Sequence, residues 1–114
     1  MATTITSTYV RPDTGTEFPK VSDFNSDYDT WRRQYFVDNS VTVDFNLSGD
    51  ELTLVATIEF PNEAAYDAWI TARDADGRNT AVGNSIKSGA ETDSVSLTIT
   101  KTDDAGNTTT LHTI

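Results

Sequence analysis

Histidine, cysteine and clustered carboxylates are the side chains that most often carry out chemistry, and this chain has few of them in a useful arrangement. It contains no cysteine and a single histidine, His112, two residues from the C-terminus. The lack of cysteine excludes thiolate catalysis, redox chemistry at sulfur and zinc–thiolate sites. A general base needs a neighbour that orients it, and the sequence around His112 supplies none. The sequence therefore predicts no catalytic residue.

Acidic residues gather in two short segments that resemble turns. Residues 74–79 (DADGRN) resemble the start of a calcium-binding loop, but the glycine comes too early and no glutamate closes the loop. Residues 103–107 (DDAGN) have the composition of a hairpin turn, with weak cation binding as the alternative. Sequence motifs for phosphate, dinucleotide, zinc-protease and serine-hydrolase chemistry are also missing. We therefore predict no metal ion and no cofactor.

The charge of the chain restricts its partners. Its 18 acidic and 8 basic residues give a net charge of −10, and the pI is about 4.2. Such a chain repels phosphate backbones, so nucleic-acid binding is not expected. The first residues, MATTITST, hold neither a basic segment nor an apolar run. We therefore expect no signal peptide, no membrane-spanning segment and, by default, a cytoplasmic location.

Hydrophobic periodicity predicts the elements of one domain that spans residues 1–114. Alternating apolar and polar residues favour five strands, and apolar residues at helical spacing favour two helices. Ser26 with Asp29 has the spacing of a capping box, Asn62 is placed to cap the second helix, and Gly77 is placed to end it. Residues 78–93 are predicted to be a long connection, with one further helical turn as the alternative. The strands are expected at 3–10, 41–47, 52–60, 95–100 and 108–114, and the helices at 23–38 and 63–73.

This order of elements is typical of an α+β fold, the ferredoxin-like split β-α-β arrangement with an added C-terminal strand. Both helices should cover one face of an antiparallel sheet. They should bury the alternate apolar residues of segments 41–47 and 52–60. Trp31 and Trp69 occur at helical spacing among other apolar residues, so we assign them to the core rather than to a ligand pocket.

The face of the sheet without helices is predicted to be rich in threonine, which makes up about one residue in six of the chain. It is either a solvated face or a contact surface. The last strand ends at the C-terminus and is expected to lie at an edge, where it can pair with a neighbouring sheet. The 78–93 connection is a further candidate contact. The candidate interface residues are Thr42, Asp44, Thr53, Val55, Thr57, Thr98, Thr110, Leu111, His112 and Ile114.

Residues 54–70, LVATIEFPNEAAYDAWI, join a strand that ends in Phe60 to a capped helix. This segment resembles the dimeric α/β-barrel group of ferredoxin-like proteins, which includes antibiotic-biosynthesis-type monooxygenases. Residues 1–74 as a whole also resemble small virion proteins of tailed bacteriophages, especially marine and cyanobacterial ones. The first resemblance implies a small dimeric enzyme or ligand-binding protein with a pocket near Trp31, Tyr66 and Trp69. The second implies a structural protein that binds other virion proteins or copies of itself.

The second resemblance agrees better with the residues. Aromatic and aliphatic side chains fill the predicted core positions, and His112 lies outside them. We therefore predict a non-enzymatic structural or assembly protein of a phage particle, located in the virion as a decoration, neck or tail component and oligomeric when assembled. The monooxygenase-type enzyme or ligand-binding protein is the alternative. A third possibility is a flat threonine array that binds ice or carbohydrate. Such an array requires regular threonine spacing on adjacent strands, which sheet twist usually disturbs.

Overall fold

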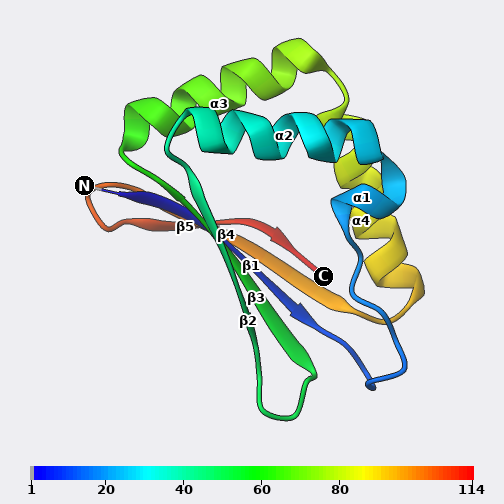
Figure 1. The fold of residues 1–114 in the computed structure, drawn as a ribbon. Helices are drawn as coiled ribbons and strands as arrows, with labels where there is room; N and C mark the ends of the chain where they lie inside the picture. The colour runs from blue at the N-terminus through cyan, green and yellow to red at the C-terminus, as the bar shows by residue number, and fades with distance from the viewer. Residues whose placement is uncertain (1) are drawn as a thin grey trace.

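The computed structural model describes residues 2–114 and has the predicted α+β architecture (Figure 1). A single antiparallel sheet has the strand order β2-β3-β1-β4-β5. The first four strands follow the ferredoxin-like order, and β5 is added outside β4, so the predicted split β-α-β fold with an extra C-terminal strand is confirmed. The elements are β1 (Thr3–Val10), α1 (Val21–Phe24), α2 (Ser26–Asp38), β2 (Thr42–Leu47), β3 (Thr53–Phe60), α3 (Glu63–Asp76), α4 (Asn79–Thr92), β4 (Ser96–Thr102) and β5 (Thr108–Thr113).

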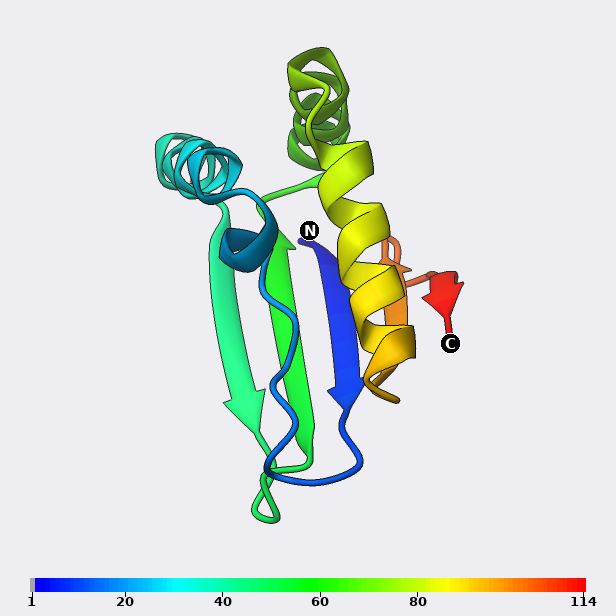
Figure 2. The same ribbon diagram turned by 90° about the vertical axis from the view of Figure 1, so that its right-hand side faces the viewer.

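All four helices lie on one side of the sheet. Helices α2 and α3 lie side by side across one end of it, while α4 runs along the sheet in front of β1 and β4 (Figures 1 and 2). The core beneath α2 and α3 is aromatic: Phe36 and Trp69 have ring centroids 4.9 Å apart, and Phe60 is fully buried. Trp31 packs against Trp69 with ring centroids 5.8 Å apart, which confirms that both indoles belong to this cluster.

The residues predicted to form a long connection, 78–93, are instead largely the helix α4. This segment has two glycines and no side-chain cap, so its local sequence favours a helix only weakly. Its helical signal is one stripe at steps of four residues, made by the buried Val82 and Ala90 and the half-buried Ile86. Packing of that stripe on the sheet stabilises the helix, and this outweighs the weak local propensity.

The helix ends confirm two of the three predicted signals. Asn62 caps α3 by accepting a hydrogen bond from the Ala65 N–H at 2.9 Å, and Gly77 ends α3 with a left-handed φ of 84°. The capping box predicted at Ser26 is wrong, because the cap of α2 is the preceding residue, Asn25. Its Oδ1 accepts from the Tyr28 N–H at 3.0 Å, and a short helical turn, α1, precedes it.

Strand β2 departs most from the prediction. Its apolar residues should be buried beneath the helices, yet Val43, Phe45 and Leu47 are 41%, 62% and 45% exposed. The helices explain the difference, because α2 and α3 cross only one end of the sheet and leave most of β2 uncovered (Figure 1). The alternation of apolar and polar residues correctly predicts which face of the sheet these residues occupy. The helices expected to bury them do not extend along β2.

Candidate functional site

The sheet face without helices carries a regular block of threonines. Three threonines of β1 lie directly opposite three of β4, and β5 continues each row. Residues opposite one another in an antiparallel ladder share a face, so nine threonine side chains form three rows of three. The hydroxyl oxygens of Thr102 and Thr108 lie 3.0 Å apart. The rows are Thr4–Thr102–Thr108, Thr6–Thr100–Thr110 and Thr8–Thr98–Thr113.

Seven of the ten predicted interface residues lie on this threonine face, as their register partners show. Asp44 pairs with Thr57, and Thr57 pairs with Thr6, so the surface continues across all five strands. Only Asp44 and Glu59 contribute charge among the paired positions of this face. The seven residues are Thr42, Asp44, Thr53, Val55, Thr57, Thr98 and Thr110.

The other three predicted interface residues lie at the end of β5. Leu111 occupies a register shift, a β-bulge, and is half exposed. His112 pairs with Ile99 and therefore lies on the helix-bearing side, away from the threonines. The backbone N–H of Ile114 donates to the Leu97 oxygen at 3.0 Å, which ties the C-terminus to β4. The bulge interrupts the edge of the sheet at β5 and makes it a poorer template for another strand.

The opposite edge, β2, is regular and open. Ser48 donates its N–H to the Thr53 oxygen of β3 at 2.9 Å. Inward and outward backbone groups alternate along an antiparallel strand, so Val43, Phe45 and Leu47 direct their N–H and C=O groups away from β3. All six residues of β2 are exposed, and none is lysine or proline. The edge thus offers unpaired backbone groups beside an apolar row, a surface that sequence reasoning assigned to the core.

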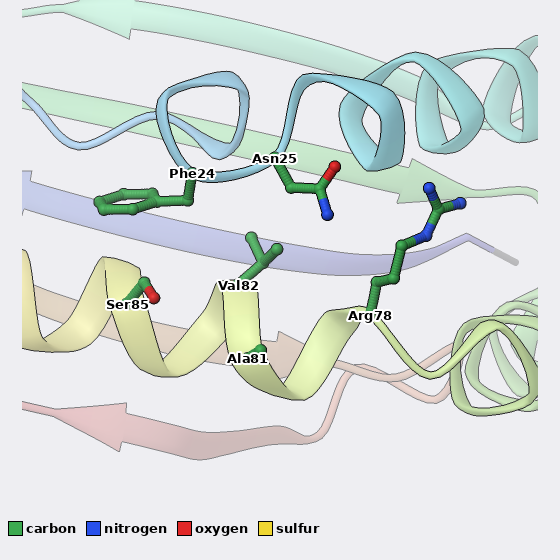
Figure 3. Close-up of a pocket in the computed structure, with 6 residues that line it drawn as sticks. All are labelled: Phe24, Asn25, Arg78, Ala81, Val82 and Ser85. Carbon is green, nitrogen blue, oxygen red and sulfur yellow. The ribbon is translucent and has the colours of Figure 1, made fainter.

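Two small cavities lie near α4. The first, of about 140 Å³, separates Phe24 and Asn25 from Ala81, Val82 and Ser85 of α4, with Arg78 at one end (Figure 3). The second, of about 150 Å³, lies between the sheet, α2 and α4. Pockets for drug-sized ligands are usually about 300–1,000 Å³, so both are small. Trp31, Tyr66 and Trp69, where the enzyme alternative placed a pocket, line neither cavity.

In the two acidic turns, donors of the protein itself hydrogen-bond to the carboxylates of Asp76 and Asp103. Asp103 accepts backbone hydrogen bonds from Asn107 and, with a smaller effect, from Ala105, and both lower the pKa of its carboxyl group. Both oxygens of Asp76 accept from Arg78 at 2.8 Å, and this contact lowers the pKa of Asp76. These contacts favour a hairpin turn and a helix end over the two cation sites considered from the sequence. Within residues 2–114, no three histidine or acidic side chains are placed to hold a metal ion.

None of the helices in residues 2–114 has the length and apolar character needed to cross a membrane. Comparisons of the chain with protein-family models, with curated proteins and with solved structures found no match.

Proposed function

We propose that this chain is a non-enzymatic assembly module that acts through protein–protein contacts, as a decoration, neck or tail component of a phage particle. The exposed apolar row Val43, Phe45 and Leu47 on the open edge β2 is the observation that carries the proposal. Soluble proteins usually protect such edges with charges, prolines or bulges. The resemblance of residues 1–74 to small virion proteins supports the assignment to a particle.

The occupant that best fits this edge is the β2 strand of a second copy. Antiparallel pairing about a two-fold axis at Phe45 places Val43 opposite Leu47 and Asp44 opposite Asn46 of the other copy. Outward backbone groups then meet at Val43, Phe45 and Leu47, and the whole apolar row gains a partner. Shifting the axis to Asp44 would set two carboxylates directly opposite each other, which is destabilising. Charge therefore selects the register centred on Phe45.

The threonine face has a secondary role in this proposal. The face is polar and carries little charge, so it suits lateral contacts with other particle proteins rather than a dry dimer interface. Edge pairing leaves this face free, because it uses backbone groups in the plane of the sheet. The proposal thus assigns self-association to β2 and contacts with unlike partners to the threonines.

Sedimentation velocity at micromolar concentration tests the proposal with three variants. Phe45→Lys should leave only monomer, because a charged side chain at the two-fold axis would face its own copy. Leu111→Lys makes the same charge change on the opposite edge and should leave the dimer intact. Thr57→Arg should also leave it intact, because this side chain points to the threonine face.

Each alternative outcome identifies a different surface. A dimer lost only in Leu111→Lys would move the contact to β5, and one lost only in Thr57→Arg would move it to the threonine face. A wild-type chain that stays monomeric up to about 100 μM, well above the ordinary micromolar range of specific association, would overturn β2 self-association. Circular dichroism of each variant confirms that a lost dimer does not reflect unfolding.

A further inference from the structure

The cavity of about 150 Å³ combines an apolar floor with positively charged side chains. Leu97 and Ile99 of β4 and Ile86 of α4 line it, together with Tyr9, Arg32 and Lys87. No acidic residue lines it, although the chain carries a net charge of −10. Figure 2 shows why these groups meet, since α4 lies directly over β1 and β4.

Arg32 has a buried hydrogen-bond donor without an acceptor. Its Nη2 donates to Asp29 Oδ1 at 2.9 Å, but its Nε is buried and has no partner within residues 2–114. Asp29 also accepts from Arg33 Nε at 2.8 Å, so one carboxylate serves two guanidinium groups. The two guanidinium groups and one carboxylate together carry a net positive charge, and Arg32 is the member of this cluster that lines the cavity. A buried donor without an acceptor is unfavourable, and an anionic ligand or a water molecule at this position would accept its hydrogen bond.

Tyr9 and Lys87 add two further donors to the lining. The Tyr9 hydroxyl makes no side-chain hydrogen bond, and Lys87 forms no ion pair, with any residue in the described range 2–114. Tyr9 and Arg32 line the same cavity. Burial raises the pKa of Tyr9, and the positive charge of Arg32 opposes this shift more weakly. Tyr9 therefore stays protonated at neutral pH and remains able to donate.

We propose that this cavity binds a small monocarboxylate with an apolar tail. The carboxylate accepts hydrogen bonds from Arg32, Lys87 and Tyr9, and the tail contacts Ile86, Leu97 and Ile99. The volume sets the size: it exceeds the space for one water several-fold, yet it is too small for a nucleotide or a drug-sized molecule. This binding site goes beyond the assembly role and does not depend on it.

NMR titration of the full chain with sodium hexanoate tests the site. Hexanoate should cause saturable shifts in the methyl signals of Ile86 and Ile99. 1-Hexanol has the same tail without the charge, and inorganic phosphate has charge without the tail, so each should bind at least about tenfold more weakly, a 1.4 kcal/mol difference. Equal binding of hexanol would overturn recognition of the carboxylate. Equal binding of phosphate would overturn the role of the tail, and no saturable shift with hexanoate would overturn the site.

Matched variants separate local recognition from overall charge. Lys87→Met should weaken hexanoate binding at least about tenfold. Lys20→Met removes the same charge from an exposed residue that does not line the cavity, and it should change the affinity less than twofold. An equal loss in both variants would overturn the assignment of Lys87, because it would indicate long-range attraction only.

Filling the cavity provides a test that leaves every charge in place. Gly83 lies on α4 and lines the cavity, and a Cβ added there meets no atom within 4 Å. Gly83→Leu should therefore occupy the cavity and abolish the hexanoate shifts. Retained binding in this variant, with an otherwise native amide spectrum, would overturn the location of the site.

Discussion

Glu63, in the first turn of α3, joins the start of β1 to strand β4. Its Oε2 accepts from the hydroxyl of the buried Thr3 at 2.8 Å, and its Oε1 lies 2.5 Å from Lys101 Nζ. Lys101 Nζ also lies 4.2 Å from the centre of the Tyr66 ring. Lys101 first, and then Thr3, lowers the pKa of Glu63, while the same contact raises the pKa of Lys101.

The signs of these two shifts define the pH range in which the contact stabilises the fold. Glu63 has a lowered pKa, so its contribution is present above its ordinary pKa and is lost as the pH falls through the folded value. Lys101 has a raised pKa, so its contribution is present below its ordinary pKa and is lost only at higher, strongly basic pH. Both groups therefore stabilise the fold at neutral pH. The effect is modest, because solvent reaches both side chains.

Replacing Glu63 with glutamine should lower the melting temperature at pH 7, and the difference from wild type should shrink as the pH falls toward 3. The amide keeps an acceptor for Thr3 but loses the charge that pairs with Lys101. Circular dichroism melts between pH 3 and pH 7 measure the difference. Glu91→Gln, at an exposed position without an ion pair in the described residues, should show no such trend. A difference that stays constant with pH would mean that glutamine simply packs less well.

At the scale of elements, the sequence predicts structure where a local rule and the tertiary packing agree. Strand β1 follows its alternation from Thr3 to Val10, and α3 begins after Asn62 and ends before Gly77. Helix α4 is different, because its glycines and polar residues favour a loop and only three apolar residues mark its buried stripe. Helix α4 packs against α1, α3 and β4, and local propensity cannot describe these tertiary contacts.

The two glycines at and near α4 should respond in opposite directions to the same substitution. Gly83 has helical geometry and open space around its missing Cβ, so Gly83→Ala should stabilise the fold by about 0.5–1 kcal/mol. Gly77 has a φ of 84°, so Gly77→Ala should destabilise it by about 1 kcal/mol. Urea unfolding measures both values. If Gly83→Ala instead destabilises the fold, the added Cβ must meet a close neighbour. That result would contradict the open space that the structure shows around Gly83.

At the scale of the whole molecule, alternation reveals which face a residue occupies but not how far the covering helices extend. The threonine face could therefore be predicted from the sequence, since its residues need no cover. The exposure of Phe45 could not, because it depends on where α2 and α3 cross the sheet. The cavity beside Arg32 could not be predicted from the sequence either, because residues of β1, β4, α2 and α4 that are distant in sequence form it.

The net charge of −10 makes a prediction about how such a molecule assembles. Two copies repel each other over the whole surface, and this repulsion reaches about 30 Å at 0.01 M salt but only about 10 Å at 0.1 M. The contact proposed at β2 is made by backbone groups and apolar side chains, which salt does not weaken through screening. Added sodium chloride should therefore strengthen the dimer, with a dissociation constant that falls several-fold between about 10 mM and 0.5 M salt.

Sedimentation equilibrium across this salt range measures the dissociation constant directly. Phe45→Lys lowers the net negative charge by one, so general repulsion alone would make this variant dimerise better than wild type. Loss of its dimer at every salt concentration would show that the apolar edge, and not the overall charge, holds the two copies together. A wild-type dimer that dissociates as salt rises would instead indicate a contact made by ion pairs, and β2, whose only charged residue is Asp44, would then be excluded as the interface.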